Sequence, residues 1–81
     1  MQVKVQFFSQ LKEVAGAPQV GLELPEGATV AELLAHLYRV HPALEKWDRN
    51  ILIGVGVEFV DRNFVIRPED AIAIMPPVQG G

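Results

Sequence analysis

The stretch TVAELLAHLYRV, residues 29–40, is the strongest single indication of the fold. Thr29 and Glu32 have the spacing of a capping box, in which the hydroxyl accepts from a backbone N–H group and the carboxylate reaches back to another. Apolar residues then recur at helical intervals, and Pro42 disfavours helical backbone at the residue before it. The sequence therefore predicts one dominant helix over residues 29–40, with one apolar face turned to a core.

Alternating apolar and polar residues on both sides of this helix predict strands. The predicted strands are 2–8, 19–24, two within 51–60 that meet near Gly56, and 71–75. This order of elements predicts an α+β fold in which a mixed sheet packs on one main helix. A β-grasp, ubiquitin-like topology fits both the order and the length of 81 residues.

The connections carry turn and capping residues. Ser9 is predicted to cap a short helix that Gly16 ends. Residues 42–50 are expected to form a loop with one helical turn. Surface ion pairs are expected within a short segment that contains Glu58, Asp61 and Arg62.

The composition argues against several classes of protein. Hydrophobic residues make up 49% of the chain, too many for a disordered segment, and the net charge of −3 argues against nucleic acid as the main partner. No stretch has the length of a membrane span, and the N-terminus lacks the layout of a secretory signal. We expect one domain over residues 1–81, located in the cytoplasm, with no membrane partner.

The body of the sequence offers little chemistry of its own. There is no cysteine, so thiolate metal sites and a cysteine nucleophile are excluded. His36 and His41 are five residues apart, which is not the spacing that places two ligands on one helical face. No glycine-rich phosphate-binding motif occurs. We expect this chain to bind no metal and no cofactor.

The C-terminal end is the unusual feature. The last predicted strand runs into two prolines, and the chain continues as Val78, Gln79, Gly80 and Gly81. A frayed end is the ordinary interpretation of such residues. Prolines, however, stiffen the exit from a sheet, and glycines lack the Cβ that would keep them out of a narrow channel. Residues 76–81 are therefore also interpreted as a tail that presents the Gly81 carboxylate to another protein.

Three stretches carry a resemblance to a known family: VKVQFFSQLKEVAG at 3–16, VGVEFV at 55–60 and RPEDAIAIMPPVQGG at 67–81. In these stretches the chain resembles the small subunits of molybdopterin synthase, which are ubiquitin-like sulfur carriers. The resemblance extends along essentially the whole chain. One departure is Gly56, where relatives often carry Asn, and it concerns the geometry of a turn.

The resemblance implies a division of labour among several proteins. An E1-like partner would use ATP to adenylate the Gly81 carboxylate, and a sulfur donor would convert the acyl adenylate to a thiocarboxylate. The sulfur would then pass to cyclic pyranopterin monophosphate to build the dithiolene of molybdopterin. The chain would be non-catalytic alone, because the active site would lie on the large subunit of an expected heterotetramer.

Two groups of residues follow from this interpretation. The tail that enters the large subunit would comprise Pro77, Val78, Gln79 and Gly80, with Gly81 as the reacting residue. The alternation of the strands places Phe8 and Met75, and with them Phe59, on the sheet face opposite the helix. This face is predicted to dock on the large subunit, with Lys12 at its rim.

Other functions fit the same tail. The chain could carry sulfur for thiazole synthesis or tRNA thiolation. It could also be a ubiquitin-like modifier whose Gly81 forms an isopeptide bond with lysines of target proteins. A plain β-grasp binding module with an inert tail is the remaining alternative.

Overall fold

Five strands and three helices make up residues 1–77, the part of the chain that the computed structural model describes. In chain order they are β1 (Gln2–Phe7), α1 (Gln10–Ala15), β2 (Gln19–Glu23), α2 (Val30–Val40), the 3₁₀ helix η1 (Pro42–Asn50), β3 (Leu52–Val55), β4 (Glu58–Val60) and β5 (Ala71–Met75).

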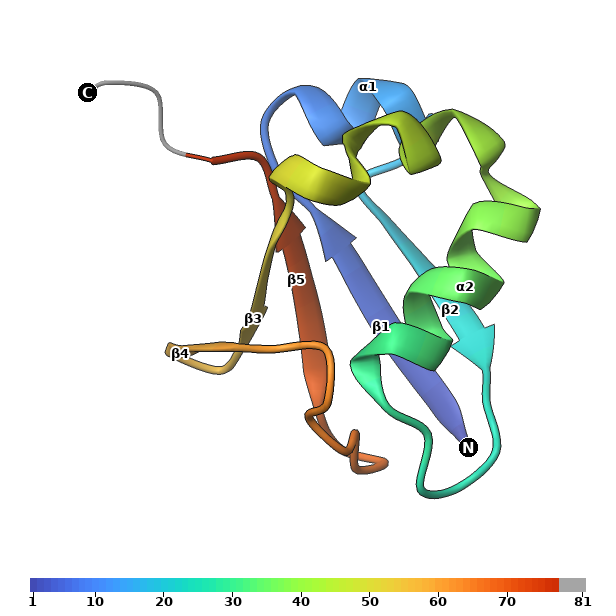
Figure 1. Cartoon of the computed structure of the whole chain (residues 1–81). Helices are drawn as coiled ribbons and strands as arrows, with labels where there is room; N and C mark the ends of the chain where they lie inside the picture. The colour runs from blue at the N-terminus through green and yellow to red at the C-terminus, as the bar shows by residue number, and fades with distance from the viewer. Residues whose placement is uncertain (78–81) are drawn as a thin grey trace.

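The strands form one mixed sheet in the order β2-β1-β5-β3-β4. β1 pairs antiparallel with β2 and parallel with β5, whereas β3 pairs antiparallel with both β5 and β4. Figure 1 shows α2 lying across one face of this sheet. The predicted α+β architecture, a mixed sheet on one main helix, is therefore confirmed.

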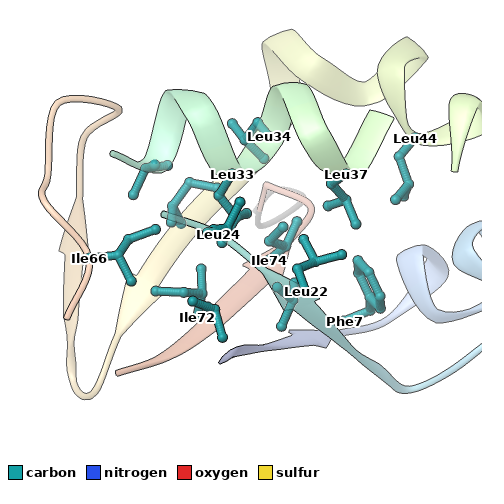
Figure 2. Close-up of a cluster of buried hydrophobic side chains, with 14 of the residues drawn as sticks. Phe7, Leu22, Leu24, Leu33, Leu34, Leu37, Leu44, Ile66, Ile72 and Ile74 are labelled. Atoms are coloured by element: carbon teal, nitrogen blue, oxygen red, sulfur yellow. The ribbon is translucent and has the colours of Figure 1, made fainter. Parts of the chain in front are cut away.

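The core lies between α2 and the sheet. Alternation along the strands sends every second side chain to this side, so Val3 and Val5 of β1 and Ile72 and Ile74 of β5 are buried. The buried residues of α2 are Val30, Leu33, Leu34 and Leu37. Figure 2 shows leucines of α2 facing the isoleucines of β5.

The start of α2 has the predicted capping box. The Glu32 amide donates to Thr29 Oγ1 at 3.3 Å, and the Thr29 amide donates to Glu32 Oε1 at 2.9 Å. The amides of Val30 and Ala31 donate to carbonyl groups of the segment that follows β4, at 3.0 Å each. The first turn of the helix is therefore satisfied both by its own cap and by a segment distant in sequence.

Two predictions about the connections were wrong. Ser9 precedes α1 as expected but has φ 55° and makes no side-chain cap hydrogen bond. An N-cap hydroxyl normally reaches the helix from extended backbone, which Ser9 does not adopt. The second error concerns Pro42–Asn50, which form a continuous 3₁₀ helix in place of a loop with one turn.

The turn between β3 and β4 confirms that two strands meet near Gly56. Gly56 has φ 62°, in the left-handed region that glycine enters without strain. Asn is one of the residues that best tolerates the same region. Gly56, where relatives often carry Asn, is therefore compatible with the same turn.

Candidate functional site

The last strand delivers the chain end from the middle of the sheet. β5 lies between β1 and β3, and its residues Ile72 and Ile74 are buried. The Phe8 amide donates to the Ile74 carbonyl at 3.1 Å, next to the strand's last residue. Pro76 and Pro77 follow, both half-buried. The tail therefore begins on a strand that is held on both sides.

The remaining predicted tail residues, Val78, Gln79, Gly80 and Gly81, lie outside the described residues. Figure 1 shows where the described chain leaves the sheet: at the end of β5, beside the segment that links β1 to α1 and the segment that links η1 to β3.

The strand register brings the predicted docking residues to one face. Leu52 pairs with Met75, and Gly54 pairs with Phe59. Their neighbours Ile53 and Ile74 face the core, so Leu52, Met75 and Phe59 project from the opposite face. Phe59 is 69% exposed.

Phe8 completes this surface beside the tail exit. It follows the buried Phe7 at the end of β1, so alternation turns it away from the core, and it is 44% exposed. We refer to Phe8, Leu52, Phe59 and Met75 as the apolar face. The prediction that Phe8, Phe59 and Met75 share a face is thus supported by the structure, and their docking role stays a prediction.

Gly54 makes the apolar face continuous. A Cβ placed on Gly54 would lie 3.5 Å from Met75 Cε and 3.8 Å from Ala73 Cβ. The Met75 side chain therefore extends over Gly54. Gly54 pairs on its other side with Phe59 of β4, so Met75 extends toward Phe59. The apolar surface runs from the tail exit to the edge strand β4.

Lys12 lies on α1, and its side chain is exposed. Its backbone carbonyl accepts the amide of Gly16, the residue that ends the helix, at 2.9 Å. Figure 1 places α1 at the end of the sheet from which β5 exits. The helix that carries Lys12 is thus at the end of the sheet where β5 ends (Figure 1), and the rim position of Lys12 stays a prediction.

The two histidines have local packing roles. The ring of His41 meets the ring of Phe7 edge-on at 6.5 Å, and His36 Nδ1 lies 3.5 Å from Arg39 Nη2. Residues 1–77 contain no group of three or more potential metal-ligating side chains. Over the same part of the chain, none of the helices has the length and apolarity needed to cross a membrane.

Comparison with known proteins matches residues 5–81 to the model of the ThiS family. The chain belongs to the ThiS family. It is 36% identical to the molybdopterin synthase sulfur carrier subunit of Chlamydomonas reinhardtii over 84 aligned positions, covering 100% of both chains. The resemblance found in the sequence is therefore confirmed.

Solved structures confirm the β-grasp, ubiquitin-like fold of this ThiS-family chain. SAMP1, small archaeal modifier protein 1 of Haloferax volcanii, superposes with a TM-score of 0.88 at 30% identity and 100% coverage of both chains. A chain from the complex of subunits 1 and 2 of molybdopterin-converting factor of Helicobacter pylori gives a TM-score of 0.73 at 24% identity, again with both chains fully covered.

The ThiS-family chain also contains a polar cluster that sequence reasoning missed. Tyr38 Oη donates to Asp48 Oδ1 at 2.6 Å, and Arg62 Nη1 donates to the same oxygen at 2.8 Å. Arg62 was expected to pair with Glu58 or Asp61, and that prediction was wrong. Since Asp48 lies in η1 and Arg62 lies in the segment after β4, no short sequence pattern could have indicated their contact.

The cluster perturbs the acidity of its members. The hydrogen bonds from Tyr38 and Arg62 lower the pKa of Asp48, because they stabilise the carboxylate. Burial, followed by the hydrogen bond to Asp48, raises the pKa of Tyr38. Asp48 is therefore ionised and Tyr38 neutral across the physiological pH range.

Asp48 should make the fold more sensitive to acid. Its pKa is lower in the folded than in the unfolded state, so the unfolded chain binds more protons and stability falls as pH drops below about 4. We expect Asp48→Asn to lessen the drop in urea midpoint between about pH 5 and pH 3. The effect is modest because the Asp48 side chain is 39% exposed. Equal pH slopes for the two proteins would contradict the role assigned to Asp48.

Proposed function

We propose that this chain is the sulfur carrier subunit of a molybdopterin synthase. The observation that carries the proposal is the position of β5: a central strand, buried at Ile72 and Ile74, leads to the Gly-Gly end of the sequence, beside an exposed apolar face. Identity of 36% over the full length with a sulfur carrier subunit supports the same function.

The chemistry would take place on the Gly81 carboxylate. An E1-like partner would catalyse attack of this carboxylate on ATP, with pyrophosphate as the leaving group. A free carboxylate is a poor electrophile, and the acyl adenylate supplies a good leaving group, AMP, when a sulfur donor attacks the acyl carbon. The resulting thiocarboxylate would give its sulfur to cyclic pyranopterin monophosphate, and two loaded carriers would complete each dithiolene.

The large subunit of the synthase is the proposed partner for the apolar face. Exposed aromatic side chains such as Phe8 and Phe59 are enriched at protein interfaces, and contiguous apolar surface on a small domain marks an interaction site. Docking there would place the exit of the tail, after Pro77, at the partner's surface. Residues 78–81 would then enter the partner's active site, with Lys12 at the rim of the contact.

Phe59→Asp tests this arrangement. The substitution puts a charge in the apolar face without touching the core, so we expect the affinity for the large subunit of the same organism to fall roughly 30-fold or more. Stability should change by only about 0.5 kcal/mol, because Phe59 is mostly exposed. Titration calorimetry measures the affinity, and thermal unfolding measures the stability.

Val57→Asp is the matched control for this experiment. Val57 is fully exposed at the hairpin tip between β3 and β4, two residues from Phe59. The Val57→Asp substitution introduces the same charge outside the apolar face. The affinity of this variant for the large subunit should therefore stay within about twofold of the wild-type value. Wild-type affinity in Phe59→Asp would remove the apolar face from the proposed interface.

A protein modifier is the second candidate function. It is supported by the likeness to SAMP1, at 30% identity and a TM-score of 0.88. Intact mass spectrometry of the protein from its own cells separates the two. Replacement of one terminal oxygen by sulfur supports the carrier, and a set of larger covalent adducts that requires Gly81 supports the modifier. Carriers for thiazole synthesis or tRNA thiolation would give the first result but would not yield dithiolene product with the large subunit.

A further inference from the structure

Arg62 joins three parts of the fold just beyond the end of β4. Its backbone carbonyl accepts the Ala31 amide at 3.0 Å, in the first turn of α2. Its guanidinium donates to Asp48 Oδ1 at 2.8 Å and to the Asp48 backbone carbonyl at 2.5 Å, near the end of η1. Two bonds to one residue fix the orientation of the planar guanidinium as well as its position.

Tyr38 connects Asp48 back to α2. The phenol donates to the carboxylate oxygen that also accepts from Arg62, at 2.6 Å. Asp48 is therefore held from two directions, by a helix on the covered side of the sheet and by the segment after β4. We refer to Tyr38, Asp48 and Arg62 as the clamp.

The strand β4 has few other restraints. It is three residues long, lies at the edge of the sheet and pairs only with β3 among the described strands. Glu58 and Phe59 are exposed, and Val60 is half-buried. Little burial therefore restrains β4, and Arg62 of the clamp follows its last residue, Val60, by only two positions.

We infer that the clamp positions β4, and with it Phe59, for docking on the large subunit. Tyr38, Asp48 and Arg62 are positioning residues in this scheme, since none of them belongs to the apolar face. The identity of the docking partner rests on the proposed function, whereas the effect of the clamp on β4 does not. The two parts can therefore be tested separately.

Hydrogen exchange tests the effect on β4. Asp48→Ala removes the carboxylate that both partners bind, and we expect the β4 amides to exchange about fivefold faster while the β1 and β5 amides are unchanged. Glu45→Ala is the matched control, because Glu45 is an exposed carboxylate of the same helix and its side chain makes no hydrogen bond to any of residues 1–77. Unchanged exchange in β4 of Asp48→Ala would overturn the inference.

Affinity for the large subunit tests the link to Phe59. Asp48→Ala should weaken binding about fivefold, and Tyr38→Phe should do so to a smaller extent. In a Phe59→Ala background, Asp48→Ala should have no further effect, because the residue that the clamp positions is gone. A purely structural role would give the same loss in both backgrounds, and that result would overturn the inference.

The outcomes for the two proposals are distinguishable. If the wild-type chain does not bind the large subunit, the proposed function fails, and the exchange rates in β4 alone decide whether the clamp positions that strand. If the wild-type chain binds, the affinities decide whether the clamp acts through Phe59. All variants are compared at a temperature where thermal unfolding shows each to be folded.

Discussion

Removal of Gly81 is expected to reduce sulfur loading by roughly 100-fold or more while leaving the melting temperature unchanged. The shortened chain still ends in a carboxylate on Gly80, but that group is drawn back by about 3.5 Å, the length of one extended residue. Misplacement of a reacting group by about 1 Å already costs on the order of 100-fold in rate. The fraction of protein carrying a terminal thiocarboxylate, measured by intact mass spectrometry, reports the effect.

Gln79→Ala is the matched control for the tail. It preserves both the length of the tail and its two glycines, so loading should stay within about threefold of wild type. Undiminished loading after removal of Gly81 would contradict the assignment of the C-terminal carboxylate as the reacting group. We expect the melting temperature to be unaffected in both variants, because among the described residues, 1–77, the buried hydrophobic side chains run from Val3 to Ile74.

Replacement of Ile74 by alanine is expected to lower the free energy of unfolding by about 2–5 kcal/mol. Ile74 is 1% exposed, at the centre of the sheet against the leucines of α2. A domain of 81 residues has a total stability of roughly 4–12 kcal/mol, so one such cavity removes a large part of it. Urea unfolding at constant slope measures the loss.

Val57→Ala provides the comparison for this prediction. It also removes methyl groups, but from a fully exposed side chain, so the expected change is within about 0.5 kcal/mol. A loss below about 1 kcal/mol for Ile74→Ala would show that β5 is not packed as the structure describes. Since β5 leads to the tail, the Ile74→Ala variant also tests whether the tail depends on a well-packed strand before it.

The parts of the fold that could be predicted from sequence are those encoded by neighbouring residues. The capping box of Thr29 and Glu32 and the apolar intervals that follow determine α2 locally, and the strand alternation places Ile72 and Ile74 in the core. The same alternation predicts that Met75 projects from the face of the sheet opposite the helix. In each case the residues that carry the information lie within one element.

What could not be predicted depends on contacts between distant segments. Ser9 is a good N-cap by residue type, but the Phe8 amide bonds to Ile74, and the turn that follows leaves Ser9 with a positive φ. Arg62 pairs with Asp48 because the chain after β4 passes beside η1, which no local pattern indicates. The side of the sheet from which Phe59 projects could be determined only from the pairing of Gly54 with Phe59.

The position of β5 also has a consequence for how the molecule is assembled. The pairs β1–β2 and β3–β4 are synthesised earlier, yet among the described strands only β5 joins these two pairs within the sheet, and β5 is the last of them to leave the ribosome. Pairing of β1 with β5 joins residues from opposite ends of the chain, which is a slow class of folding event. The sheet therefore stays open between β1 and β3 until residues 71–75 are available to pair, so closure of the sheet and formation of the strand that leads to the tail are one event.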